Sequence, residues 1–215
     1  FIDYHKSQGL VNDVFSKDIM ERLSGNVGIG HVRMAAKDEG LDYPYLQPIV
    51  AGYRQGAMGI VHDGHISNAP ELKKDLQNKG YMFQSLLDTE VIATLLAKNT
   101  KENIEQSILD TVKMLKGSYS IIIMASEGLY AVRDFYGIKP LSIGKLNDKY
   151  LVASETCAFD SIGAEFVRDV EPGEIVRINE NGIEVVKNGA PSRRKLGVFE
   201  MVYICLLYTS DAADD

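Results

Sequence analysis

Charged side chains stand at the ends of apolar runs, where an arginine could hold an anionic substrate. Arg33 ends the run over residues 26–33, Arg133 and Asp134 end a later one, and Asp88 opens an apolar helical stretch. A guanidinium binds a carboxylate through two parallel hydrogen bonds. Each residue also fits a structural role, because charges often lie solvated at strand ends and Asp stabilises a helix start.

The histidines and cysteines do not form an obvious metal site. His62 and His65 are separated by a predicted Asp-Gly turn rather than placed on one helix face, and no nearby Cys or Glu completes a ligand set. Cys157 fits a small buried hydrophobe better than a nucleophile. Cys157 and Cys205 are too few for a disulfide framework, which fits a reducing compartment.

The first elements that position these residues are strands. Alternating Val27, Ile29 and His31 predict a strand over residues 26–33. The glycines of this stretch also suggest a nucleotide-binding loop, but such a loop must open a helix, and the residues that follow continue as a strand. We therefore favour small residues in a tightly packed strand. A second strand is predicted over residues 57–62, followed by a break at Asp63 and Gly64.

Helices follow these strands, and the rest of the chain is rich in strands. Caps and apolar spacing predict helices from residue 69 to near Gly80, over residues 88–98 and over residues 101–116. This order favours largely antiparallel sheets covered by helices over a doubly wound parallel sheet. The later strands are predicted over residues 118–125, 129–133, 150–154, 165–169, 174–178 and 183–186.

The composition is that of a globular protein. The chain has 215 residues, of which 45% are hydrophobic and 25% charged, which suffices for one α/β domain or two small ones. Its 23 basic and 30 acidic residues give a net charge of −7, so an overall basic surface for nucleic acid or acidic lipid is absent. The longest strongly apolar run, residues 121–125, is too short to span a bilayer. No repeat or linker divides the chain, and we interpret it as a single domain.

Several strings together resemble the glutamine amidotransferase domains of the amidophosphoribosyltransferases. The resemblance runs in order from about residue 9 to residue 203. The early strings are shared by amidotransferases that use an N-terminal cysteine, whereas residues 154–160 and 163–174 resemble the purine enzymes specifically. The strings are GIGHVR at 28–33, LQP at 46–48, HDG at 62–64, DTEV at 88–91, AVRD at 131–134, GIKPL at 137–141, SETCAFD at 154–160 and GAEFVRDVEPGE at 163–174.

The resemblance implies an α+β protein with the four-layer αββα fold of the N-terminal-nucleophile amidotransferases and mostly antiparallel sheets. It also implies a reaction, in which an N-terminal cysteine thiol attacks the side-chain amide of glutamine and its own α-amino group acts as the base. A glutamyl thioester forms, ammonia leaves, and water releases glutamate. Ammonia then displaces pyrophosphate from phosphoribosyl pyrophosphate in a second domain, which makes 5-phosphoribosylamine for purine synthesis.

Four residues match the family's site. On this pattern Arg33 binds the α-carboxylate of glutamine and Asp88 its α-ammonium group, while the Gly64 N–H donates to the developing oxyanion. Asp63 stands where the family commonly has Asn, the second oxyanion donor. An ionised Asp would repel the oxyanion, and losing one donor costs about 3–4 kcal/mol. Asp63 would still donate if it stayed protonated, as some buried carboxylic acids do.

Other departures concern the ends of the chain and one loop. Residues 34–36, Met-Ala-Ala, replace the family's usual Tyr-Ser-Thr in the loop that closes over glutamine. The nucleophilic cysteine is missing, because neither Cys157 nor Cys205 is N-terminal. We therefore interpret residues 1–203 as a type 2 amidotransferase domain truncated at its N-terminus and inactive alone. We interpret residues 204–215 as a non-native tail, and the phosphoribosyltransferase domain as absent.

Cofactors and partners follow from the same resemblance. It implies no metal or cofactor in this chain and Mg²⁺ in the missing transferase domain. An iron–sulfur cluster stays open, because Gly197 stands near where a family cysteine often lies. It implies binding of glutamine, of phosphoribosyl pyrophosphate through the missing domain, a homo-oligomer, a cytoplasmic location, and neither nucleic acid nor membrane as a partner.

Two other functions remain open. One is a catalytically impaired homologue that binds an amino acid through Arg33 and Asp88 for regulation or assembly; Asp63 and residues 34–36 favour it. The other is a different type 2 amidotransferase, such as the hexosamine or asparagine enzyme, which the SETCAFD string disfavours.

Overall fold

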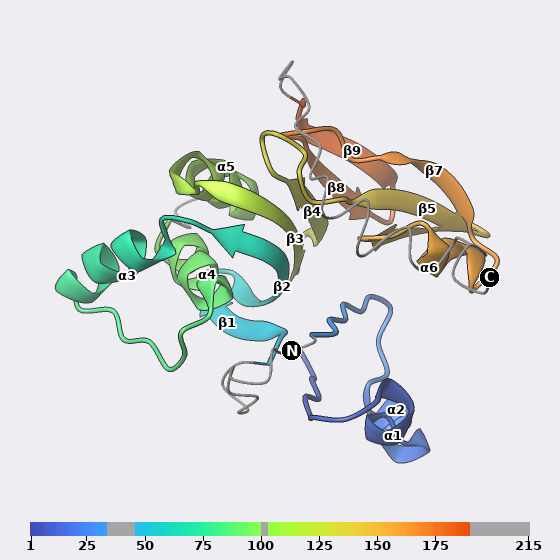
Figure 1. Cartoon of the computed structure of the whole chain (residues 1–215). Helices are drawn as coiled ribbons and strands as arrows, with labels where there is room; N and C mark the ends of the chain where they lie inside the picture. Colours follow the sequence, from blue (N-terminus) through green and yellow to red (C-terminus); the bar gives the residue numbers. More distant parts are fainter. Residues whose placement is uncertain (34–45, 100–102, 190–215) are drawn as a thin grey trace, which may run out of the picture. The chain divides into compact units, whose positions relative to one another are not determined.

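The structure, a computed structural model, describes residues 1–33, 46–99 and 103–189 (Figure 1). Within these ranges the chain forms six helices and nine strands. They fall into two compact units: the first comprises Phe1–His62, Ile66–Lys116 and Ile122–Leu129, and the second comprises Asp63–His65, Gly117–Ile121 and the chain from Tyr130. Over the described ranges, no helix combines the length and the apolar character that crossing a membrane would require.

The first unit contains most of the helices. Its central helix α4 (Asp88–Asn99) packs against strand β1 (Ile49–Tyr53) and against α5 (Ile104–Met114). Helix α5 begins at a side-chain cap, since the Gln106 N–H donates to Asn103 Oδ1 at 2.8 Å. The remaining helices of this unit are α3 (Ala69–Asn78), α1 (Val11–Val14) and α2 (Lys17–Arg22). Helices α1 and α2 are short, and neither contains a buried residue. The residues that α4 buries are Thr89, Val91, Ile92, Ala93, Leu95 and Leu96.

Strands β1 and β2 (Gly56–Ile66) form an antiparallel pair in which Ile49 lies opposite Ile60 and Tyr53 opposite Gly56. Met58, Ile60 and Val61 of β2 are at most 4% exposed. This strand therefore forms part of the core of the first unit up to His62, and it carries the chain onward into the second unit at Asp63.

The second unit is built mainly of strands. Strand β5 (Ser142–Leu146) lies between β6 (Lys149–Ala153) and β7 (Glu165–Asp169) in a three-stranded sheet, and both pairs are antiparallel. Strands β8 (Ile175–Asn179) and β9 (Gly182–Lys187) form an antiparallel hairpin. Strands β3 (Gly117–Ala125) and β4 (Gly128–Arg133), like β2, contribute residues to both units. The six-stranded sheet has the order β1-β2-β3-β4-β8-β9.

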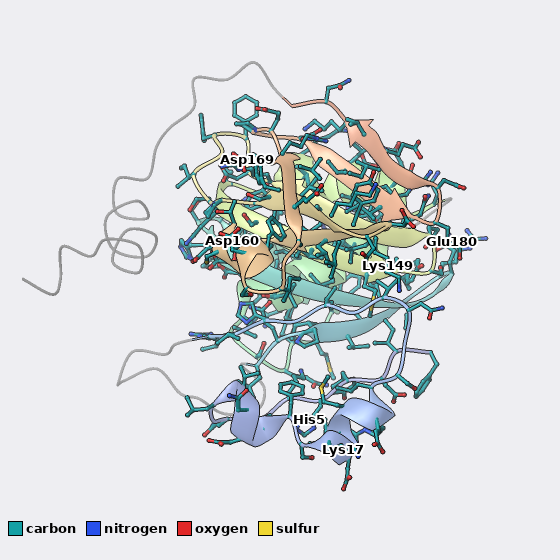
Figure 2. All side chains as sticks on the ribbon, turned by 90° about the vertical axis from the view of Figure 1, so that its right-hand side faces the viewer. His5, Lys17, Lys149, Asp160, Asp169 and Glu180 are labelled. Carbon is teal, nitrogen blue, oxygen red and sulfur yellow. The ribbon has the colours of Figure 1, made fainter. Side chains whose placement is uncertain are left out.

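A short helix, α6 (Cys157–Asp160), covers the glycine of β5. Its one buried residue, Phe159, is 2% exposed, and a β-carbon placed on Gly144 would lie 2.8 Å from Phe159 Cδ1. Figure 2 labels the ends of α6 and β7, at Asp160 and Asp169. The missing side chain at position 144 is thus what admits the Phe159 ring to the core of this unit.

The strand predicted over residues 26–33 is wrong. These residues form no strand, and Val27 and Val32 are 54% and 74% exposed. Alternation stabilises a strand only where a neighbour completes the hydrogen-bond ladder, and the glycines of this stretch weaken any intrinsic preference for one. The predicted break at Asp63 and Gly64 is also wrong, because β2 continues through these residues to Ile66.

Candidate functional site

Arg33 lines a cavity of about 210 Å³ in the first unit. A second cation, Lys6, also lines it and donates from Nζ to the Leu46 carbonyl at 3.1 Å. Partial burial lowers the pKa of Lys6. Two basic side chains in one small cavity favour an anionic ligand group such as a carboxylate. The other polar side chains that line the cavity are those of His5, Ser7, Gln8, His31 and Gln47.

A larger cavity of about 570 Å³, also in the first unit, shares part of this lining. His5, Phe15, His31 and Gln47 line both cavities. His5 and Phe15 meet edge to face with their ring centroids 5.7 Å apart, and Figure 2 labels His5 in the N-terminal segment that carries α1 and α2. The N-terminal segment therefore forms part of the walls of both cavities.

Gln47 fixes the backbone of His62 in β2. Its Oε1 accepts from the His62 N–H at 2.6 Å and its Nε2 donates to the His62 carbonyl at 2.9 Å. The same Nε2 lies 3.4 Å from Nε2 of His31. A single side chain thus supplies both backbone hydrogen bonds that a neighbouring strand residue would supply. Sequence reasoning missed this role, although Gln47 stands in the LQP string.

Asp88 is the first residue of α4, and its Oδ2 accepts from the Ile66 N–H at 2.8 Å. The next residue, Thr89, is fully buried, with its Oγ1 3.4 Å from Nδ1 of His62. The first turn of α4 therefore contacts β2 at two positions. Arg33 and Asp88 lie in the same unit. Among the described residues, however, Asp88 is not one of those that line the Arg33 cavity.

Gly64 lies in the second unit and has a conformation that favours glycine. Its φ is +119°, and a β-carbon there would lie 2.9 Å from Tyr119 Cα and would also overlap the Ser118 carbonyl oxygen. A side chain at this position would therefore both strain the backbone and collide with β3. The fold itself thus requires a glycine at position 64, where the resemblance places the backbone N–H that donates to the oxyanion.

Asp63 is not a buried acid. Its side chain is 51% exposed, and its Oδ2 lies 3.3 Å from Nζ of Lys139. A half-exposed carboxylate paired with an ammonium group differs from the apolar environment that keeps a carboxylic acid neutral. Lys139 is the residue near the expected oxyanion position that sequence reasoning missed, although it stands in the GIKPL string.

Arg133 and Asp134 are structural residues rather than solvated strand-end charges. The Arg133 guanidinium donates to the carbonyls of Gly137, Lys139 and Val170 at 2.7–3.0 Å. Asp134 is fully buried, and its carboxylate accepts from the Tyr136 and Lys139 N–H groups at 2.9 and 3.1 Å. Together these two residues hold the loop that carries Lys139.

Cys157 is exposed, which corrects the expectation that it is buried. Its Sγ–H donates to Glu155 Oε2 at 3.3 Å. In the part of the chain that the structure describes, no group of three or more His, Cys, Asp or Glu side chains could hold a metal ion. The expectations for residues 34–36, Gly197, Cys205 and residues 204–215 lie outside the described residues.

Comparison with known proteins identifies extensive similarity. The family described as "Glutamine amidotransferase domain" matches residues 32–161. The amidophosphoribosyltransferase of Methanothermobacter thermautotrophicus is 43% identical over 201 residues, and that of Bacillus subtilis is 38% identical over 200. Each alignment covers 93% of this chain but 42% of the relative. The chain thus spans less than half the length of these curated relatives.

Two solved structures share the fold. One is described as the glutamine phosphoribosylpyrophosphate amidotransferase from B. subtilis complexed with ADP and GMP, with a TM-score of 0.84 and 36% identity. The other is described as the allosteric regulatory enzyme of purine biosynthesis, with a TM-score of 0.88 and 37% identity. The matches cover 92% and 94% of this chain and 43% of each solved chain.

Proposed function

Because this chain belongs to the glutamine amidotransferase domain family, we propose that it binds glutamine through Arg33 and Asp88. A free amino acid carries one charge of each sign, and a guanidinium and a carboxylate fixed apart from each other complement both. The observation that carries the proposal is that Arg33 and Lys6 line one small cavity in a domain of this family. The Ile66 N–H, which holds the carboxylate of Asp88, adds a fixed orientation for the second charge.

For the longer protein to which this domain would belong, we propose the amidophosphoribosyltransferase reaction. An N-terminal cysteine thiol attacks the glutamine amide carbon, the nitrogen leaves as ammonia, and water releases glutamate from the thioester. The Gly64 N–H stabilises the developing oxyanion. Ammonia then displaces pyrophosphate from phosphoribosyl pyrophosphate. The identity of 43% over almost the whole chain to one such enzyme supports this substrate.

A second candidate function is amino-acid binding without catalysis. The observation that favours it is the exposed carboxylate of Asp63 beside Gly64, where the family's neutral Asn would donate to the oxyanion. Glutamate formation distinguishes the two functions in the full-length protein, because a binding protein releases glutamine unchanged. The same assay on the 215-residue chain tests the prediction that this chain alone does not hydrolyse glutamine.

Binding of glutamine to the 215-residue chain tests the first proposal directly. We expect isothermal titration calorimetry to detect binding of glutamine to the wild-type chain. Arg33→Met and Asp88→Asn are each expected to weaken the affinity for glutamine about tenfold or more, which corresponds to the loss of one charged hydrogen bond. Asn at position 88 can still accept from the Ile66 N–H, so this variant removes the charge while it keeps the local structure.

Two exposed charges that lie away from these residues serve as matched controls. Arg22→Met in α2 and Asp75→Asn in α3 remove the same charges at the surface and are expected to leave glutamine affinity unchanged. Equal affinity in the wild-type, Arg33→Met and Asp88→Asn proteins would show that these two residues do not bind the ligand. Absence of any glutamine binding to the wild-type chain would contradict the proposed function itself.

A further inference from the structure

Lys139 forms an ion pair with Asp63 inside the second unit, and the two side chains differ in how far they are buried. Its Nζ lies 3.3 Å from Asp63 Oδ2, and the lysine side chain is 14% exposed whereas that of Asp63 is 51% exposed. Most lysine side chains on a protein surface extend into water, where their charge is screened and mobile. The side chain of Lys139 is instead mostly buried, with its ammonium group beside the Asp63 carboxylate.

The backbone of Lys139 is held on both sides of its α-carbon. Its N–H donates to Asp134 Oδ2 at 3.1 Å, and its carbonyl accepts from Arg133 Nε at 2.8 Å. Asp134 is itself fully buried and anchored, because its own N–H donates to the Tyr119 carbonyl at 2.9 Å. The same β3 segment lies against Gly64. The position of Lys139 is thus fixed by the structure that surrounds the proposed oxyanion donor.

We propose that Lys139 is a positioning residue that compensates for Asp63 at the oxyanion site. An Asn side chain is neutral and donates N–H, whereas an ionised Asp carries a full negative charge and only accepts. An Asp carboxylate and a Lys ammonium together carry no net charge, and the ammonium group contributes N–H donors. The Asp63–Lys139 pair therefore takes the place of one neutral amide. This inference rests on the proposed glutamine-binding function.

Glutamate is a stable probe of this arrangement. It has the same α-carboxylate and α-ammonium groups as glutamine, but its side chain ends in an anion where the amide of glutamine is neutral. An uncompensated Asp63 would repel that anion much more strongly than it repels an amide. The ratio of glutamate affinity to glutamine affinity therefore measures the charge at the Asp63 position and is insensitive to general damage to the site.

The test is a double-mutant cycle on the 215-residue chain, with both ligands measured by calorimetry. We expect Lys139→Met to weaken glutamate binding at least tenfold and glutamine binding less than threefold. We expect Asp63→Asn to strengthen glutamate binding, and the double variant Asp63→Asn with Lys139→Met to return it to within threefold of the wild type. A structural role alone would not be rescued by removing the partner's charge.

Two further variants complete the design. Lys139→Arg keeps the charge and is expected to keep the wild-type affinity ratio. Lys149→Met removes an exposed lysine from β6, labelled in Figure 2, and is expected to change neither affinity. If Lys139→Met is poorly folded, a folded double variant still tests the proposal, because its glutamate affinity is expected to lie within threefold of the wild type.

The proposal is overturned if Lys139→Met leaves the affinity ratio unchanged. It is equally overturned if Asp63→Asn does not restore glutamate binding to a folded double variant. Both results presuppose that the wild-type chain binds glutamine. If the wild-type chain binds neither amino acid, the proposed function fails first, and the role of Lys139 fails with it.

Discussion

The side-chain amide of Gln47 occupies both backbone hydrogen-bonding groups of His62, accepting at 2.6 Å and donating at 2.9 Å. His62 is 6% exposed, so water cannot replace these bonds fully. Within β2, His62 directly precedes Asp63 and Gly64. Gln47 therefore joins the lining of the Arg33 cavity to the His62 backbone of the same unit.

Gln47→Leu is expected to destabilise the chain by about 2–4 kcal/mol, because it leaves a buried N–H and a buried carbonyl without their partner. Urea denaturation followed by circular dichroism measures the change. Gln77→Leu, on the exposed face of α3, is the control and is expected to stay within about 0.5 kcal/mol of the wild type. Similar values for the two variants would show that the Gln47 bonds contribute no net stability.

Gly64→Ala is expected to cost more than about 3 kcal/mol of folding free energy, because it adds a collision with β3 to an unfavourable φ. Gly163 separates these two effects: its φ is +69°, and a β-carbon added there would meet no atom within 4 Å. Gly163→Ala is therefore expected to cost only about 1–2 kcal/mol. Equal costs in chemical denaturation would contradict the close approach of Ser118 and Tyr119.

Arg133→Met is expected to destabilise the chain by about 2–4 kcal/mol, since three carbonyls lose a charged donor. The same variant should raise the hydrogen-exchange rates of amides in the loop over residues 134–140. Arg22→Met, at an exposed position of α2, removes an equal charge and is expected to be neutral. Unchanged exchange in the loop would refute the structural role of Arg133.

Tyr119 is expected to make stability fall at alkaline pH. Burial, and secondarily the charge of Asp134, raise its pKa above the ordinary value of 10.0. Above pH 10 the unfolded chain therefore releases a proton that the folded chain retains, so the unfolded state is favoured by about 1.4 kcal/mol per pH unit from this group. Below pH 10 this contribution is constant.

Denaturation of the wild-type and Tyr119→Phe proteins between pH 8.5 and 11.5 measures this slope, over a range chosen around the ordinary tyrosine value. The variant should lose the part of the alkaline slope that Tyr119 causes. Tyr81→Phe, at an exposed tyrosine, should retain it. Parallel curves for the wild-type and Tyr119→Phe proteins would contradict the prediction.

The family and the fold class could be predicted from the sequence. The α+β class with antiparallel sheets and the N-terminal-nucleophile amidotransferase fold are confirmed by the structural likeness. Helices such as α4 and α5 were predictable because their apolar spacing and caps are local signals. Strand β5 was not, since Gly144 and the charged Lys145 interrupt its pattern, and its pairing with β6 and β7 is a tertiary property.

The site could be predicted only in part. The family resemblance pointed to Arg33, Asp63, Gly64 and Asp88, and their assigned roles remain predictions. The ion pair of Lys139 with Asp63 was not predictable, because the two residues are far apart along the chain and only the fold brings their charged atoms within 3.3 Å. The burial of Asp134 was missed for a similar reason: its polar partners are backbone N–H groups, which carry no residue-type signal.

The contact of Phe159 with Gly144 has a consequence for how this domain can diverge. An aromatic ring on α6 fills the volume that a side chain on β5 would need. A larger residue at position 144 is tolerated only together with a smaller one at position 159, and either change alone leaves a collision or a void. We therefore expect homologous sequences to vary at these two positions in pairs, conserving their summed volume rather than either residue.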